Sequence, residues 1–227
     1  SGNLTLEAND SLYLFISVLV KPDSQPRPFI LRDSIRIRYN GIERFIQLSA
    51  WGQNAHFLNN EMIKGNVNWI NDLPYVISGN LQVDSNATLT IQPGCRIYFH
   101  ANSAMRVDGT LSVLGQAADS LRVYFNGDRL DEPYASFPGS WPGIYFSESS
   151  INNQLQYAVL RNGYQSLVAE GPSANISPKL ILNQCIIDNS SDAGIIGIQS
   201  DIDASNCLIS NCGKNIVIMS GGNYHFL

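Results

Sequence analysis

The chain has 227 residues, enough for one or two domains with a sizeable core. Charged residues make up only 15% of it, the net charge is −5 and no basic run occurs, so neither nucleic acid nor an anionic membrane is an expected partner. The longest apolar run, Leu12 to Val20, contains Ser17 and is too short to span a bilayer, so no transmembrane segment is predicted in this chain.

Residues 1–53 are predicted to form a small β unit. Alternating polar and apolar side chains at 34–39 and 44–48 indicate two strands that each bury one face, and Asn40-Gly41 between them is a strong hairpin signal. A β-branched and aromatic run within 4–20 predicts a further strand.

Three phrases of this unit stand out: residues 6–11, the proline-containing turn at 21–23 and the ending at 46–52. They resemble the closing half of an Ig-like β-sandwich of the hydin or choice-of-anchor kind. About four strands cannot complete a two-sheet sandwich of around seven. The resemblance therefore implies either missing strands upstream or an open face that docks on the rest of the chain.

Residues 54–72 are predicted to be a linker or cap, with a helical-looking fragment at 61–64. The segment is polar-sided and has a few apolar anchors, Trp69 and Ile70 among them. Such a segment suits the start of a repeat array, whose first rung needs a cover.

From residue 73 onward the sequence repeats itself. The pattern of 77–83 returns 30 positions later at 107–113, and the phrase at 97–99 returns at 123–125 and 144–146. This alignment places Tyr98, Tyr124 and Tyr145 in one column of the same wall. Repeats of about 20 to 30 residues indicate stacked units, and alternation within each unit indicates strands. With no helical periodicity between the strands, they are expected to run parallel and to coil, giving an all-β parallel β-helix of about six or seven rungs over 73–227.

A column of asparagines supports the coil. The segments 158–162, 185–189 and 207–211 align at steps of 27 and 22 residues, which places Asn162, Asn189 and Asn211 at one turn of successive rungs. Stacked amides can bond to one another and to turn backbone, and such a structural ladder is typical of right-handed parallel β-helices. The chain here resembles the pectin-lyase-like superfamily, and more closely exported or surface bacterial proteins that place such a helix after an Ig-like domain.

The same alignment assigns the inside and the outside of these strands. Ala158, Cys185 and Cys207 share an inward column, where free thiols acting as small apolar side chains are expected. The four cysteines, which include Cys95 and Cys212, lack the spacing of a zinc site.

The alternate residues of these strands point outward and form two columns. Val159, Ile186 and Leu208 form an apolar column, expected to be covered by the N-terminal unit or a partner, or else to line a groove. Arg161 and Asp188 fall beside each other and predict a cross-rung salt bridge. The alternative, implied by the resemblance to polysaccharide lyases, is an arginine base beside acidic calcium ligands.

One insertion, at about 128–141, interrupts the repeats, and insertions in a solenoid often lie on its binding face. Its carboxylates could hold Ca²⁺, and Tyr134, Phe137 and Trp141 could stack on a sugar ring. The alternative is a structural loop whose aromatic rings fold onto the helix wall while Arg129 pairs with a carboxylate. The candidate ligand-binding residues are Asp128, Arg129, Asp131, Glu132, Tyr134 and Trp141.

No catalytic constellation is recognisable: the three histidines, His56, His100 and His225, are scattered, and no serine occupies a nucleophile elbow. The resemblance implies an exported, surface-anchored bacterial protein, at the cell surface, outside the cell or in the periplasm. It would be a non-catalytic structural or binding module for glycan or protein ligands. The alternative is a polysaccharide lyase or glycoside hydrolase, which requires at least three charged side chains converging on one groove.

The last five residues, 223–227, resemble the start of an unfinished rung, which would expose an apolar interior and free strand edges. We therefore expect either that the native chain continues or that a partner covers this end, with end-to-end or lateral homo-association as one form of such cover.

Overall fold

The structure, a computed structural model, describes residues 5, 7, 9–20, 29–172 and 177–227. The chain divides into two compact units, residues 1–54 and 55–227. Apart from two short 3₁₀ helices, η1 (Asp119–Leu121) and η2 (Tyr134–Ser136), the regular structure of the described residues is all strand, which confirms the all-β prediction. The turn predicted at 21–23 lies outside the described residues.

The first unit contains one antiparallel hairpin, formed by β1 (Phe29–Tyr39) and β2 (Ile42–Gly52). Its turn residues Asn40 and Gly41 have φ values of 46° and 77°. Two consecutive positive φ values suit the tight turn whose twist matches that of the flanking strands. The predicted hairpin is therefore confirmed.

The strand predicted within residues 4–20 is absent from the part that the structure describes. Residues 9–20 form no strand, and Tyr13 and Phe15 are 81% and 98% exposed. A strand needs a neighbour for its backbone N–H and C=O groups, and in the described part of this unit only β1 and β2 pair with each other. Alternation signals a tendency to extend, but it does not supply the neighbour.

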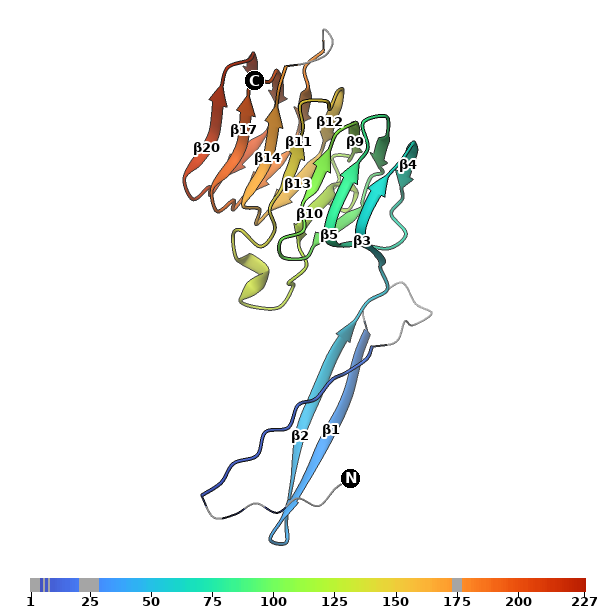
Figure 1. Ribbon diagram of the computed structural model, residues 1–227, viewed down its shortest axis with the longest axis vertical. Coiled ribbons are helices and arrows are strands. Elements are labelled where there is room, and N and C mark those ends of the chain that lie inside the picture. Colours follow the sequence, from blue (N-terminus) through green and yellow to red (C-terminus); the bar gives the residue numbers. More distant parts are fainter. Residues whose placement is uncertain (1–4, 6, 8, 21–28, 173–176) are drawn as a thin grey trace. The chain divides into compact units, whose positions relative to one another are not determined.

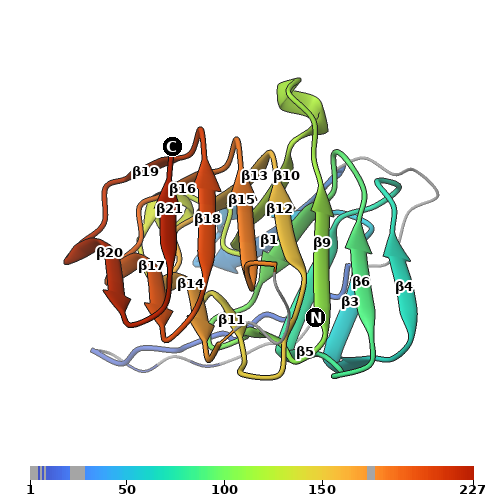
Figure 2. The same cartoon turned by 90° about the horizontal axis from the view of Figure 1, so that it is seen from above.

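The second unit is a coil of short parallel strands in three walls (Figures 1 and 2). The first wall contains β7 (Arg96–Phe99), β10 (Val123–Gly127), β13 (Ala158–Arg161), β16 (Ile186–Asp188) and β19 (Leu208–Ser210). The second wall contains β8 (Met105–Val107), β11 (Ile144–Phe146), β14 (Gln165–Glu170), β17 (Ala193–Ile198) and β20 (Asn215–Ser220). The third wall contains β4 (Asn66–Trp69), β6 (Thr88–Ile91), β9 (Thr110–Leu114), β12 (Asn153–Gln156), β15 (Leu180–Asn183), β18 (Ile202–Ser205) and β21 (Tyr224–Phe226).

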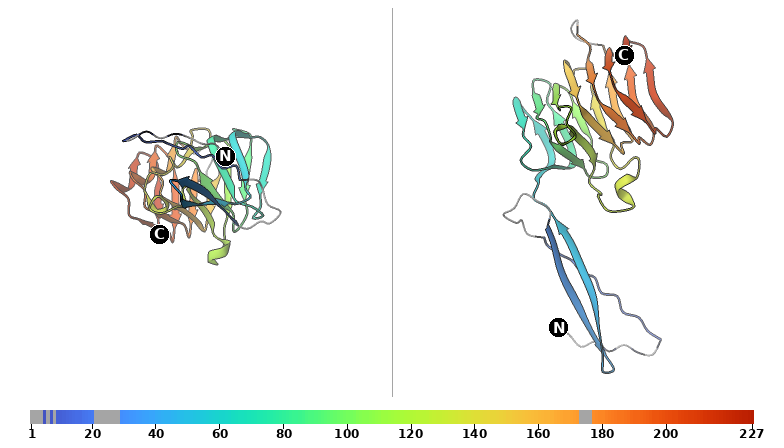
Figure 3. Two further views of the ribbon diagram at one scale, coloured as in Figure 1. Left: turned by 90° about the horizontal axis from the view of Figure 1, so that it is seen from below. Right: turned by 180° about the vertical axis from the view of Figure 1, so that it is seen from behind.

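Two longer strands join the first wall to the second. β5 (Tyr75–Val83) pairs with β7 through its first residues and with β8 through its last, and β3 (His56–Ile63) pairs along β5. Each wall thus repeats once per turn of the chain, and the third wall, with seven strands, counts seven rungs. These large parallel sheets nearly close around one core, an arrangement compatible with the predicted parallel β-helix (Figure 3).

Of the predicted linker or cap at 54–72, residues 55–72 form part of this coil. β3 and β4 pair in parallel with β5 and β6, so the rungs begin at His56 rather than at residue 73. The helical-looking fragment at 61–64 lies largely in β3, since one turn is too short to be stable as a helix and β5 offers its backbone a partner. Ile63 and Trp69 are only 6% and 5% exposed, which makes this segment a packed first rung.

The strand register of the later rungs is as predicted. Val159 pairs with Ile186 and Ile186 with Leu208, and Arg161 pairs with Asp188. The inward column beside them is tightly packed, and its members Phe125, Leu160 and Ile187 are at most 1% exposed. All four cysteines are free thiols.

The register predicted for the early repeats is wrong. Tyr124 pairs with Arg96 rather than with Tyr98, and Tyr145 lies in the second wall opposite Arg106. The pattern of 77–83 likewise does not stack on 107–113, because residue 83 pairs with residue 107. Every wall alternates inward and outward residues with the same period, so similar apolar phrases arise on different walls and do not identify the wall.

Candidate ligand-binding surface

The charged residues of the insertion between β10 and β11 pair with close neighbours. Arg129 donates from Nε and Nη2 to the two carboxylate oxygens of Asp131, both at 2.8 Å, and its guanidinium lies 4.1 Å from the centre of the Tyr134 ring. The hydrogen bonds from Arg129 lower the pKa of the Asp131 carboxyl. Asp128 lies 2.7 Å from Nδ1 of His100.

These pairs bear on the predicted calcium site. Asp128 pairs with the imidazole of His100 and Asp131 with the guanidinium of Arg129, while Glu132 is exposed beside Pro133. Among the residues that the structure describes, no three His, Cys, Asp or Glu side chains come together as metal ligands. The geometry of the insertion thus matches the structural alternative, in which Arg129 neutralises an adjacent carboxylate.

Trp141 is buried, with 1% of its surface exposed. Its indole stacks on Phe99 at a centroid distance of 4.4 Å and an interplanar angle of 11°, and Nε1 donates to the carbonyl of Arg161 at 2.7 Å. Both the ring face and the polar edge are therefore used inside the fold. The prediction that Trp141 stacks on a sugar is wrong, whereas Tyr134 and Phe137 remain 43% and 48% exposed.

The asparagine ladder holds the insertion against the first wall. Nδ2 of Asn162 donates to Oδ1 of Asn126 and to the carbonyl of Ala135, each at 2.9 Å, and Nδ2 of Asn189 donates to the carbonyl of Ser136 at 2.9 Å. Residues 135 and 136 belong to η2. The ladder therefore begins one rung earlier than predicted and fixes the position of the loop.

The third predicted member of the ladder takes another partner. Asn211 has the same left-handed backbone, with φ 53°, but its Nδ2 donates to Oδ1 of Asp188 at 2.8 Å. Asp188 also accepts from Ser210 Oγ at 2.8 Å and lies 3.9 Å from Nε of Arg161. The predicted cross-rung salt bridge is thus present, as a long contact.

A hollow of about 390 Å³ lies on the outer face of the first wall. The outward column of the register, Arg96, Tyr124, Val159 and Ile186, crosses it from β7 to β16. We call this hollow the arginine groove, because three arginines line it. Its lining residues are Arg96, Asp119, Arg122, Tyr124, Val159, Arg161 and Ile186.

The groove has an apolar floor and a cationic rim. Val159 is 2% exposed and Ile186 is partly buried, while Arg96 and Arg161 are exposed. The outward apolar column predicted from the sequence therefore lines a groove at Val159 and Ile186, and only its end, Leu208, is 56% exposed.

Two cations of the rim, Arg96 and Arg122, are positioned by contacts that leave N–H donors for a ligand. The guanidinium of Arg96 lies 5.6 Å from the Tyr124 ring centre, and that of Arg122 lies 5.3 Å from the Tyr157 ring centre. Arg122 also donates through Nη1 to the carbonyl of Gln184 at 3.1 Å. A guanidinium carries five N–H donors, so one such bond leaves several for a ligand.

The acidic groups of the groove are already engaged. Asp119 accepts a hydrogen bond of 2.5 Å from the hydroxyl of Tyr124. Burial, and then this bond to the carboxylate, raise the pKa of the Tyr124 phenol. With Asp119 and the neighbouring Asp188 set against three arginines, the local charge is positive.

Sequence reasoning missed Arg96 and Arg122 as site residues. The predicted alignment placed Tyr98 beside Tyr124, which put Arg96 out of the column. Arg122 lies just after η1, in a turn whose length no repeat indicated. An alignment that matched outward positions wall by wall would have brought Arg96 and Val159 together.

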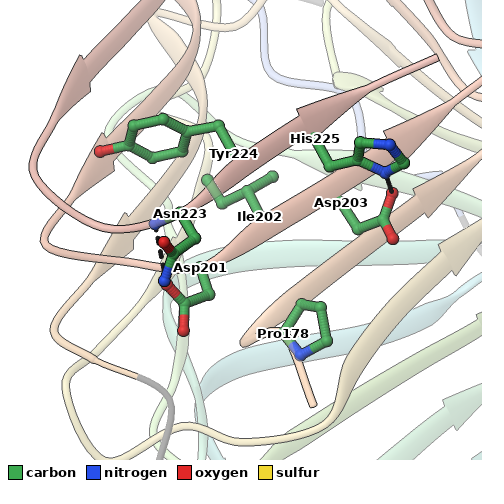
Figure 4. A pocket seen from close by; sticks show the side chains of 7 residues that line it. All are labelled: Pro178, Asp201, Ile202, Asp203, Asn223, Tyr224 and His225. Carbon is green, nitrogen blue, oxygen red and sulfur yellow. Dashed lines mark hydrogen bonds and ion pairs between the residues drawn. The ribbon is translucent and has the colours of Figure 1, made fainter. Parts of the chain in front are cut away.

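A second, smaller hollow of about 240 Å³ lies at the end of the third wall (Figure 4). Asp201 accepts two hydrogen bonds of 2.9 Å from the backbone N–H and the Nδ2 of Asn223, and Asp203 lies 3.3 Å from Nδ1 of His225 (Figure 4). Both carboxylates are paired within the protein, so this hollow offers less for a ligand than the arginine groove.

The comparisons with known proteins add no relative: no protein-family model, no curated protein and no solved structure matches the chain significantly. None of the described residues belongs to a helix that is long and apolar enough to cross a membrane.

Proposed function

We propose that this protein is a non-catalytic binding module, exported or displayed at the surface of a bacterial cell, and that the arginine groove binds an anionic glycan. In this proposal the second unit is a right-handed parallel β-helix of the pectin-lyase-like kind. The first unit is part of an Ig-like sandwich. The sparse charge of the chain and its parallel walls support this assignment.

One observation carries the proposal: Arg96, Arg122 and Arg161 surround the apolar floor formed by Val159 and Ile186. Arginine binds carboxylate or sulfate groups through paired, charge-assisted hydrogen bonds. The apolar floor and the Tyr124 ring suit the C–H face of a sugar. A sugar ring that bears an acidic group satisfies both parts of the groove at once.

The polysaccharide-degrading alternative retains a candidate site. Five charged side chains converge here, since Asp119 and Asp188 accompany the three arginines, and Arg161 lies 3.9 Å from Asp188. Both carboxylates accept hydrogen bonds from groups of the protein, and Arg161 lies beside Asp188, so neither the acidic calcium ligands nor the arginine base of that alternative stand free. This engagement favours binding over catalysis.

The test is binding of acidic and neutral oligosaccharides of equal length, measured by titration calorimetry with calcium added and then removed by a chelator. We expect the acidic series alone to bind, independently of calcium and more weakly at high salt. Arg122→Gln and Arg161→Gln are each expected to weaken binding about ten- to a hundredfold, since each removes hydrogen bonds to a charged group.

Arg129→Gln is the matched control, because Arg129 is an exposed arginine of the insertion outside the groove. Its affinity is expected to equal that of the unaltered protein. A loss of binding in this variant alone would move the site to the insertion. Equal binding of neutral and acidic sugars would refute the anionic specificity, and release of shortened or unsaturated sugars would establish the enzyme alternative.

A further inference from the structure

Cys185 and Cys207 occupy the same position in two successive rungs. Each immediately precedes a strand of the first wall, β16 or β19, and Ile186 pairs with Leu208 in the residue that follows. Neighbouring strands lie about 4.8 Å apart, which is within the Cα separation of about 4.4–6.8 Å that a disulfide requires. Both cysteines are free thiols.

The two sulfurs differ in access and in their other partners. Cys185 is 1% exposed and its Sγ lies 3.2 Å from the carbonyl of Leu155. Cys207 is partly exposed, with its Sγ 3.3 Å from the carbonyl of Ser205. A reagent from solution therefore meets Cys207 first, and Cys185 lies beside it in the preceding rung.

The interaction between the two side chains also divides the acidity of the pair. The Cys185 side chain, together with nearby backbone groups, outweighs burial and lowers the pKa of the Cys207 thiol below its ordinary value. The Cys207 side chain, and then burial, raise the pKa of Cys185. The thiolate is the nucleophile in thiol chemistry, and reactive redox cysteines are typically accessible, of low pKa and next to a resolving thiol.

We propose that Cys207 and Cys185 form a redox dithiol that exchanges with small disulfides, with Cys207 as the attacking and Cys185 as the resolving residue. The Cys207 thiolate attacks one sulfur of the small disulfide, forming a mixed disulfide and releasing one thiolate. Cys185 passes its proton to that thiolate and attacks Sγ of Cys207, which expels the second thiolate; this thiolate takes up from water the equivalent of the proton that Cys207 lost. Two protein thiols are oxidised by two electrons, and one small disulfide is reduced to two thiols.

The product ties β16 to β19 across the last two rungs. It closes a loop between residues 185 and 207, and such a cross-link stabilises the folded state chiefly by restricting the unfolded chain. The inference is independent of the arginine groove. Neither of the other cysteines has the same arrangement: burial raises the pKa of Cys95 to about 11, and the Cys212 thiol lies 3.6 Å from the carbonyl of Ser210.

The experiment treats the reduced full-length chain with oxidised glutathione and maps the products by mass spectrometry of non-reduced peptides. We expect one internal disulfide, between Cys185 and Cys207, and loss of two free thiols. In Cys185→Ala the reaction is expected to stop at a glutathione adduct on Cys207. Alanine is tolerable there because Ala158 occupies this column one rung earlier.

Cys207→Ser is expected to leave Cys185 unmodified, and Cys212→Ser, the matched control, to react as the unaltered chain does. The proposal is overturned if the unaltered chain forms no Cys185–Cys207 bond, or if Cys212 is modified before Cys207. These two readouts use the protein without substitutions, so a variant that fails to fold does not obscure the result.

Discussion

Asn189 donates from Nδ2 to Oδ1 of Asn162 at 2.7 Å, across one step of the coil. Asn162 in turn donates to Asn126 and to the carbonyl of Ala135. One side chain therefore links three successive rungs and holds the insertion. Its backbone, with φ 61°, is left-handed, a conformation that asparagine tolerates better than most residues.

Replacement of Asn162 should separate these two contributions. Asn162→Ala loses the amide and strains the backbone, so we expect the free energy of unfolding to fall by about 2–4 kcal/mol. Asn162→Gly loses only the amide, so its free energy of unfolding should fall by about 1 kcal/mol less. Urea denaturation measures both. Asn211→Ala is the control, with a smaller expected loss because its amide is exposed and bonds to Asp188 at the surface. A glycine variant as stable as the unaltered protein would show that the ladder adds nothing.

Trp141 should affect stability rather than binding. Trp141→Ala empties a large core site beside Phe99, and we expect a loss of about 3–5 kcal/mol. Trp141→Phe keeps most of the ring contact and loses mainly the bond to the Arg161 carbonyl, so about 1–3 kcal/mol is expected. Thermal unfolding and glycan titration are the measurements. A stable Trp141→Phe that no longer bound an acidic glycan would reinstate Trp141 as a contact residue.

Gly143 should tolerate no side chain. It has φ 123°, and a Cβ added there would lie 1.8 Å from the carbonyl oxygen of Gln165 in the next rung. Gly143→Ala is expected to reduce stability by more than about 3 kcal/mol, because backbone cannot yield as a side chain does. Gly65→Ala is the control: its φ is 65° and an added Cβ would meet nothing within 4 Å. In Gly65→Ala the left-handed backbone strain alone should lower the free energy of unfolding by about 1 kcal/mol. Similar chemical-denaturation midpoints for the two variants would contradict this account.

Asp108 should make the stability of the fold depend on pH at the acidic end. Burial raises the pKa of its carboxyl, but hydrogen bonds from Arg106, Ser147 and Gln82 outweigh it, so the pKa lies below its ordinary value. The unfolded chain then binds the proton more readily than the folded one. The stabilisation is therefore complete above about pH 4, the unfolded value, and is lost as the pH falls through the lower folded value.

Asp108→Asn is the variant that tests this. It should cost about 1.5–3 kcal/mol near neutral pH, since the bond to a charged partner is weakened. The difference from the unaltered protein should shrink below about pH 4, as Asp108 itself becomes protonated. Urea midpoints measured between acid and neutral pH give the comparison. If the stability difference between Asp108→Asn and the unaltered protein did not change with pH, the negative charge of Asp108 would not be what stabilises the fold here.

The later rungs could be predicted from the sequence because 158–162, 185–189 and 207–211 share both their apolar phrase and their terminal asparagine. The early rungs lacked such a second marker, and the phrase around Tyr98, Tyr124 and Tyr145 was assigned to one column although Tyr145 lies in another wall. The strand predicted within 4–20 failed for a related reason: alternation favours extension, but pairing requires an available edge.

The sequence by itself determined that residues 73–227 form short parallel strands, joined in the described part without α-helices, and that Asn162 and Asn189 stack. The alternation of polar and apolar residues, the glycine turns and the recurring asparagine are local properties, and they do not depend on the length of the turns. Tertiary structure alone decided that Trp141 is buried against Phe99 and that Arg96, Arg122 and Arg161 meet on one face. Those outcomes depend on how many residues each turn contains, because a turn such as the insertion lengthens a rung without moving the strands that it joins.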